Sequence, residues 1–141
     1  MMLALTSCVD EHYEVVETIY VDSHTEYSTV TTDRWRKYDQ PNDLESSNWS
    51  YFYYDLNVPK LTNEVFDYGI MNAYLTMGSK SKVSPLPFDD FYLDHNDNNH
   101  RWTEQVTCEF APGRVRFIVK YNDFSLDVPP YDYTFMIRFM W

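Results

Sequence analysis

Apolar and polar side chains alternate along most of this chain, which is the pattern expected of half-buried β-strands. Residues 115–121 and 133–141 show it most clearly, since every second side chain there is aromatic or aliphatic. In residues 49–58 both alternating faces carry aromatic side chains, which predicts a strand covered on both sides. In chain order, the predicted strands are 12–21, 27–38, 49–58, 70–77, 88–93, 102–110, 115–121 and 133–141.

Clusters of Asp, Asn, Ser, Gly and Lys separate these strands and predict loops, for example at residues 78–82 and 94–100. The segment Ala111-Pro112-Gly113 has the composition of a tight hairpin turn. Only residues 61–68 fit a helix, since Thr62 can cap the start. Short strands with turns at this spacing are typical of an all-β fold. We therefore expect an antiparallel β-sandwich of about eight strands, immunoglobulin-like, with at most one short helical turn.

The composition narrows the classes of partner. Acidic residues outnumber basic ones by 22 to 11, so the formal net charge is −11 at neutral pH. Binding to a nucleic-acid backbone needs a basic surface, so we expect no nucleic-acid partner. Aromatic residues make up 18% of the chain, which argues against a disordered protein and favours packed β-sheets. At 141 residues the chain is long enough for one domain with its own core.

A short motif near the N-terminus bears on where the protein lies. Leu5-Thr6-Ser7-Cys8 resembles the lipobox of bacterial lipoproteins, in which an aliphatic residue and two small residues precede the cysteine that receives the lipid. The resemblance implies that Cys8 is lipidated and that residues 1–8 are the remnant of a signal peptide. Because the apolar run before Cys8 is short and no basic residue precedes it, we expect the natural start of the chain to lie further upstream.

Two acids directly follow the cysteine, in Val9-Asp10-Glu11. They resemble the acidic signal that sends lipoproteins of the Bacteroides group to the outer face of the outer membrane, although a solvated acidic tail explains the same residues. The chain as a whole resembles the small lipobox-bearing envelope lipoproteins of that group. The resemblance implies a cell-envelope protein anchored to the outer membrane by its lipid. Residues 9–25 are then a tether leading into the first strand, and residues 26–141 are the β-sandwich domain.

Few residues suggest a metal site or a cofactor. With Cys8 lipidated, Cys108 is a lone thiol, and we interpret it as a small core residue. Asp94, Asn96 and Asp97 are weak metal candidates, because hard cations prefer several oxygen ligands. Their loop lacks the central glycine and the late glutamate of an EF-hand, and Asn and Asp are also common turn residues. We expect no resident metal and no cofactor.

No residue pattern indicates catalysis. Asp89 and Asp90 are adjacent acids, so on a strand they point to opposite faces and cannot form the carboxylate pair of a glycosidase. Cys108 lies in mid-strand between apolar neighbours, which is a core position and not that of a nucleophile. We therefore expect a protein that is not an enzyme.

An aromatic platform is the candidate ligand site. Trp49, Tyr51 and Tyr53 share one face of the predicted strand 49–58. Exposed aromatic rings stack on sugar rings or pack against partner proteins, although core packing accounts for such residues as well. The sequence thus favours a non-enzymatic binding or accessory module of the cell envelope, with a glycan or a protein at the cell surface as partner. The alternatives are a structural subunit of a surface or adhesion assembly, and a hydrolase with residues dispersed over loops.

Overall fold

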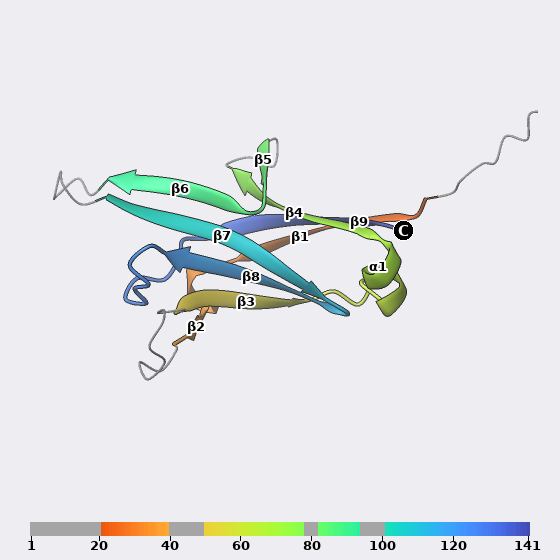
Figure 1. The fold of residues 1–141 in the computed structure, drawn as a ribbon, viewed down its shortest axis with the longest axis horizontal. Coiled ribbons are helices and arrows are strands. Elements are labelled where there is room, and N and C mark those ends of the chain that lie inside the picture. Colours follow the sequence, from red (N-terminus) through yellow and green to blue (C-terminus); the bar gives the residue numbers. More distant parts are fainter. Residues whose placement is uncertain (1–20, 40–49, 78–81, 94–100) are drawn as a thin grey trace, which may run out of the picture.

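The computed structural model describes residues 21–39, 50–77, 82–93 and 101–141. In these ranges nine β-strands form two antiparallel sheets packed face to face, which confirms the antiparallel sandwich (Figure 1). The four-stranded sheet contains, in spatial order, β1 (Ser23–Val30), β9 (Tyr133–Met140), β4 (Ile70–Met77) and β5 (Lys82–Pro85). The five-stranded sheet contains, in spatial order, β2 (Arg36–Tyr38), β3 (Tyr51–Asn57), β8 (Arg114–Tyr121), β7 (Arg101–Ala111) and β6 (Phe88–Leu93).

One α-helix, α1 (Asn63–Tyr68), lies in the part of the chain that the structure describes, where the sequence predicts a helical turn. The side chain of Thr62 accepts a hydrogen bond of 3.3 Å from the backbone N–H of Val65 and so caps the helix. The helix ends at Gly69, where a Cβ atom would lie 2.5 Å from the carbonyl oxygen of Val65 and 2.8 Å from that of Met140. Only glycine lets the helix end this close to β9.

The strand predicted at 27–38 is wrong as a single element. β1 ends at Val30, a 3-10 turn named η1 follows at Thr32–Arg34, and the chain continues as β2 in the other sheet. Trp35, which is 7% exposed, is buried where the chain passes between the layers. Alternation with a period of two did not reveal this change of sheet, because β2 has only three residues, all exposed, and shows no alternation of its own.

β1 begins inside the segment predicted as tether. Its first residue, Ser23, lies three residues before the predicted start of the domain and pairs with Met140 of β9. The backbones of Asp22 and Trp141 also exchange two hydrogen bonds, of 2.9 and 3.0 Å. Polar residues hid the start of this strand from sequence reasoning, because β1 is an edge strand with one exposed face. The rest of the tether and the strand predicted at 12–21 lie outside the described residues, apart from Val21.

The core lies between the two sheets and is dominated by aromatic rings. Phe117 of β8 and Phe135 of β9 are fully buried and stack across the layers, with ring centroids 3.8 Å apart and 8° between the planes. Trp35 meets Phe135 edge-on at 6.3 Å. The other hydrophobic side chains at most 2% exposed are Val30, Phe52, Val58, Leu61, Val65, Leu75, Val106, Val115, Val119, Ile137 and Phe139.

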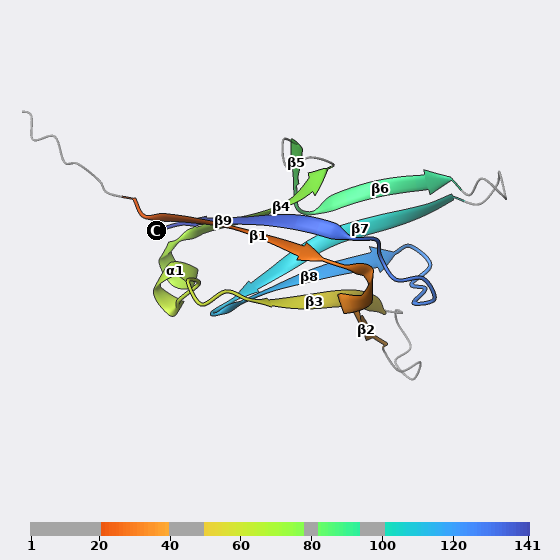
Figure 2. The same cartoon turned by 180° about the vertical axis from the view of Figure 1, so that it is seen from behind.

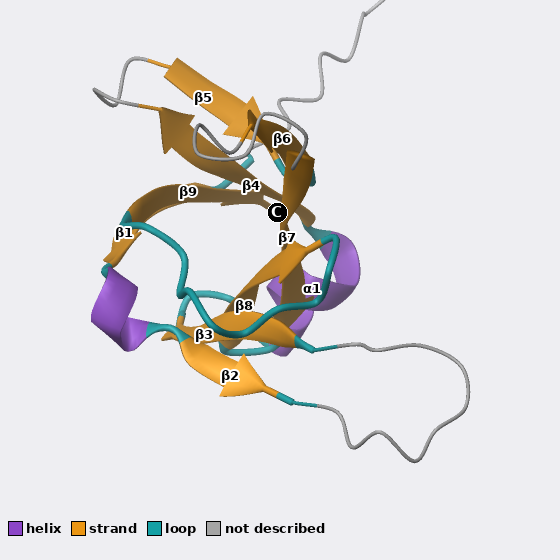
Figure 3. Cartoon of the chain, turned by 90° about the vertical axis from the view of Figure 1, so that its left-hand side faces the viewer, coloured by secondary structure: helices purple, strands orange, loops and turns teal. Residues whose placement is uncertain are grey.

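The two ends of the sandwich are built differently. α1 and the C-terminus lie at one end (Figures 1 and 2), together with Asp22, whose backbone is hydrogen-bonded to that of Trp141. The connection between β8 and β9, residues 122–132, lies at the opposite end. Figure 3 looks onto this second end, which the connection crosses on its way from one sheet to the other. No helix within the described ranges is long and apolar enough to cross a membrane.

Candidate functional site

A cavity of about 270 Å³ opens at the end of the sandwich that carries the 122–132 connection, and we call it the end cavity. Three aromatic side chains line it: Trp102 at the start of β7, Tyr121 at the end of β8 and Tyr131 in the connection. Antiparallel pairing of β7 with β8 brings the first two to the same end of the sheet. The other lining residues all come from the connection and are Asp123, Ser125, Val128 and Pro129.

Trp102 and Tyr121 form a corner of two nearly perpendicular rings, which we call the aromatic corner. Their centroids are 5.4 Å apart and their planes meet at 85°. Tyr92 of β6 stacks on Trp102 at 4.2 Å, and Phe52 of β3 meets Tyr121 edge-on at 6.0 Å. Rings packed on neighbouring strands in this way are held in place, so the corner exists before any ligand arrives.

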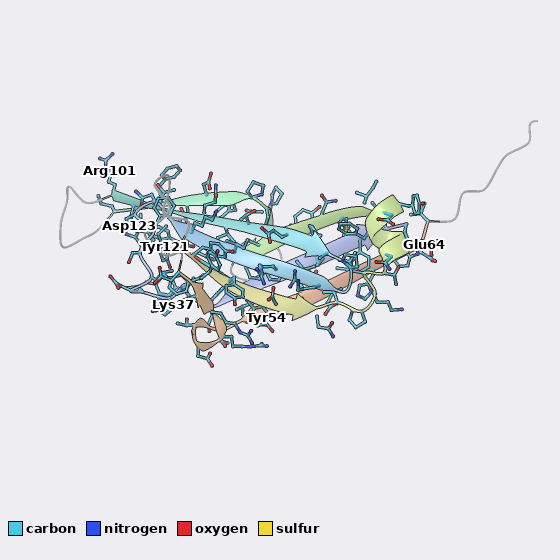
Figure 4. The ribbon with its side chains drawn as sticks, turned by 60° about the horizontal axis from the view of Figure 1, so that its bottom comes forward. Lys37, Tyr54, Glu64, Arg101, Tyr121 and Asp123 are labelled. Atoms are coloured by element: carbon cyan, nitrogen blue, oxygen red, sulfur yellow. The ribbon has the colours of Figure 1, made fainter. Side chains whose placement is uncertain are left out.

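Hydrogen bonds within the connection and to residues outside it hold the 122–132 connection in place beside the cavity. The Asp123 carboxylate accepts a hydrogen bond of 3.0 Å from the backbone N–H of Ser125. At the far end, the Asp132 carboxylate accepts hydrogen bonds of 2.8 and 3.1 Å from the backbone N–H and the hydroxyl of Thr32 in η1. The Trp35 indole N–H donates to the carbonyl oxygen of Tyr131 at 3.3 Å. Figure 4 shows Tyr121 and Asp123 close together at this end of the molecule.

A buried carboxyl group lies beside the aromatic corner. Glu104 of β7 is 2% exposed and stands directly opposite Tyr121 on β8 and Asp90 on β6. It accepts hydrogen bonds from the hydroxyl groups of Tyr121 and of Tyr133 on β9. Because β9 belongs to the other sheet, this carboxyl group ties the two layers together at the cavity end.

Burial shifts the protonation of this group. Desolvation raises the pKa of Glu104 above its ordinary value, the hydrogen bonds from Tyr133 and Tyr121 partly oppose that rise, and the charge of Asp90 adds to it. Burial likewise raises the pKa of both tyrosine hydroxyls. Glu104 does not line the end cavity, so it supports the frame of the site and does not touch a ligand. Sequence reasoning missed it, although an acid at an inward position between Trp102 and Val106 was a readable signal.

The aromatic platform proposed from the sequence lies on the outer face of the five-stranded sheet. Tyr51 and Tyr53 share that face, as the alternation predicts, with centroids 6.2 Å apart and planes at 71°. Tyr38 of β2, which sequence reasoning did not connect with them, stacks on Tyr51 at 4.7 Å. Trp49 lies outside the described residues.

Basic side chains cover the rings of this platform. The guanidinium group of Arg116 lies 4.5 Å from the ring centroid of Tyr53, and the ammonium group of Lys120 lies 5.5 Å from that of Tyr51. Two hydrogen bonds to Asp55, of 2.7 and 2.9 Å, hold Arg116 there. The platform therefore presents tilted and partly covered rings to solvent, and its role as a ligand site stays a prediction.

The remaining sequence candidates divide between described and undescribed parts of the chain. Cys8 and the weak metal candidates Asp94, Asn96 and Asp97 lie outside the described residues. Within 21–39, 50–77, 82–93 and 101–141, no three His, Cys, Asp or Glu side chains converge as metal ligands would. Cys108 is half-buried against the core, and burial raises the pKa of its thiol to about 11, so it is not a reactive thiolate.

A second cavity of about 270 Å³ shares Tyr121 with the first. Its described lining residues include one acid and one base, Asp89 and Lys120, whose charges balance. Its other lining residues are Thr103, Gln105, Asn122 and Phe124. Since the two cavities have the same volume, the aromatic and acidic lining of the end cavity distinguishes it as the candidate site.

No protein-family model matches the sequence, and no curated protein or solved structure gives a significant match. The function is therefore inferred from the residues and geometry of this chain.

Proposed function

We propose that this chain is a non-enzymatic, lipid-anchored binding module of the cell envelope, and that its ligand occupies the end cavity. The observation that carries the proposal is a cavity with three aromatic walls and a carboxylate at one end of a two-layered sandwich. Small-molecule sites are usually concave, mostly apolar and formed before binding, with a few polar groups that orient the ligand. The aromatic corner, which neighbouring rings hold in place, and the hydrogen-bonded connection meet these conditions.

The chemistry of the lining favours binding over catalysis. The polar side chains of the cavity are the Asp123 carboxylate, the Ser125 hydroxyl and the hydroxyls of two tyrosines. Nucleophilic catalysis needs a nucleophile beside a base such as histidine, and the described residues that line the cavity include no histidine, cysteine or lysine. Glu104, whose raised pKa would suit a general acid, is buried and does not line the cavity.

The position of the termini is consistent with an anchor at Cys8. Asp22, near the start of the described chain, exchanges two backbone hydrogen bonds with Trp141, and the C-terminus lies at the end of the sandwich opposite the 122–132 connection, which lines the end cavity (Figure 1). A lipid attached upstream of Asp22 leaves the cavity facing away from the membrane, where a ligand from the surroundings reaches it. The immunoglobulin-like topology expected from the strand spacing is part of this proposal. A glycan or a protein at the cell surface remains the broader class of partner.

If the end cavity is a binding site, some small molecules should bind in it and stabilise the full chain. A panel of small sugars, amines and carboxylic acids is screened by thermal denaturation, because a ligand that binds only the folded state raises the melting temperature. Tyr131→Ala should abolish each such shift. Tyr131 is 69% exposed, so its loss should cost little stability. Tyr53→Ala on the outer face is the matched control and should leave the shifts unchanged. A panel in which no compound acts through Tyr131 would contradict the proposal.

The anchor is tested separately. Cells that express the full chain are grown with a radioactive fatty acid, and the chain is compared with its Cys8→Ala variant. The wild-type chain should carry the label and the variant should not, because the thiol is the attachment point. Equal labelling of both proteins would contradict the lipid anchor and would leave the proposal about the cavity untouched.

A further inference from the structure

The charge of the end cavity restricts its ligand. Of the seven described residues that line it, one is acidic and none is basic. The Asp123 carboxylate uses one oxygen to accept the Ser125 N–H, and an ionised carboxylate has about four acceptor positions, so it keeps capacity for a ligand. Arg101, at the start of β7, does not line the cavity, and its side chain lies apart from Asp123 (Figure 4). The formal net charge of −11 adds to the attraction for cations.

The aromatic corner restricts the shape of the ligand. Rings whose planes meet at 85° cannot both lie parallel to one flat sugar face. One face of Trp102 is moreover taken by Tyr92, which stacks on it at 4.2 Å. A tetrahedral group, in contrast, presents a substituent to each wall of a corner. Alkylammonium groups are tetrahedral, and the faces of tryptophan and tyrosine attract cations.

The size of the cavity agrees with this shape. Ligand pockets for drug-sized molecules usually occupy about 300–1,000 Å³. The end cavity, at about 270 Å³, falls just below that range and suits a headgroup of a few heavy atoms.

We infer that the end cavity binds a small organic cation of the alkylammonium class, with its charge beside Asp123 and its alkyl groups in the aromatic corner. This inference rests on the proposed function and names the ligand class of the same site. The carboxylate supplies the charge partner, and the perpendicular rings supply the apolar walls that a hydrated metal ion would not need. A neutral sugar would leave the carboxylate without a charged partner.

The test compares two probes of nearly equal shape. The full chain is titrated calorimetrically with choline and with 3,3-dimethylbutan-1-ol, in which a carbon atom replaces the quaternary nitrogen. Choline should bind at least about tenfold more tightly, because only the cation gains from the ring faces and the carboxylate. Asp123→Asn should weaken choline binding by about tenfold and leave the neutral alcohol unchanged. The asparagine oxygen can still accept the Ser125 N–H, so the turn of the connection is kept.

Two controls sharpen the outcome. Asp127→Asn removes a charge from the same connection at a residue that does not line the cavity, and choline binding should stay within about twofold of the wild type. Methyl β-D-glucoside serves as a neutral sugar probe. Absence of choline binding, equal binding of the two matched probes, or an Asp123→Asn variant that binds choline normally would each overturn the inference. If only the glucoside or only the alcohol bound, and Tyr131→Ala abolished that binding, the inferred ligand class would be wrong. The end cavity would still be a binding site.

Discussion

Phe117→Ala should lower the free energy of unfolding by about 3–5 kcal/mol. Phe117 is fully buried, and its ring stacks on Phe135 of the other sheet with centroids 3.8 Å apart. Truncation removes apolar surface from the core and also leaves a void, because the strands around it are fixed by their ladders and cannot collapse into it. Urea denaturation at neutral pH measures the loss.

The matched control is a phenylalanine on the same sheet. Phe91 of β6 is 79% exposed, so Phe91→Ala should change the free energy of unfolding by less than about 0.5 kcal/mol. A loss below about 1 kcal/mol for Phe117→Ala would contradict the stacked arrangement of the two layers, because a fully buried ring cannot be removed so cheaply.

Glu104→Gln should remove a fall in stability that the wild-type protein shows as the pH rises above about 4.5, the ordinary pKa of a glutamate. Burial raises the folded-state pKa of Glu104, so the folded protein binds this proton more tightly than the unfolded chain does. The stabilising effect of the bound proton is complete below the unfolded pKa. It is lost as the pH rises through the folded pKa, with a slope of at most about 1.4 kcal/mol per pH unit.

Three groups face Glu104, and they determine what each substitution at this position changes. They are Tyr121 on β8, Tyr133 on β9 and Asp90 on β6. Glutamine is neutral at every pH and keeps an oxygen that accepts from the tyrosines, so its stability should vary less across this window. Glu104→Ala leaves the buried hydroxyls without an acceptor and should cost about 1–3 kcal/mol for each of them.

Urea denaturation of the three proteins from about pH 4 to about pH 8 measures these effects. Asp55 titrates in a different window. The hydrogen bonds from Arg116 lower the pKa of its carboxyl below 3.8, so the stability that it contributes is lost only at more acidic pH. Parallel pH profiles for the wild type and Glu104→Gln would contradict the assignment of Glu104 as a buried, proton-binding group.

Local patterns were sufficient for much of the fold. The hairpin at Pro112-Gly113 and the capped helix α1 depend on turn and capping chemistry within a few residues, and both were readable. β6 lies at the edge of its sheet, directly after Pro85 and Pro87, which agrees with the rule that proline cannot donate to a central ladder. The short strand β5, in contrast, begins inside a predicted loop, since its four residues are too few to show a pattern of their own and are ordered by pairing with β4, the strand directly before it.

The candidate site was less predictable for a physical reason. Alternation placed Tyr51 and Tyr53 on one face, but it did not reveal that Arg116, about sixty positions further along the chain, covers the ring of Tyr53. Trp102 lies on a predicted strand, yet the cavity beside it needs Tyr131 from a connection that forms no strand. Such contacts arise only when distant segments meet, so a single sequence does not encode them in any local pattern.

The most direct test of the central claim is a titration of the full, isotopically labelled chain with choline, followed by two-dimensional amide nuclear magnetic resonance. If the end cavity is the binding site, the indole signal of Trp102 and the backbone signal of Tyr131 should move, while those of Tyr51 and Tyr53 on the outer face stay in place. If the Tyr51 and Tyr53 signals moved while those of Trp102 and Tyr131 stayed unchanged, the end cavity would not be the binding site. The ligand would instead bind on the outer face of the five-stranded sheet.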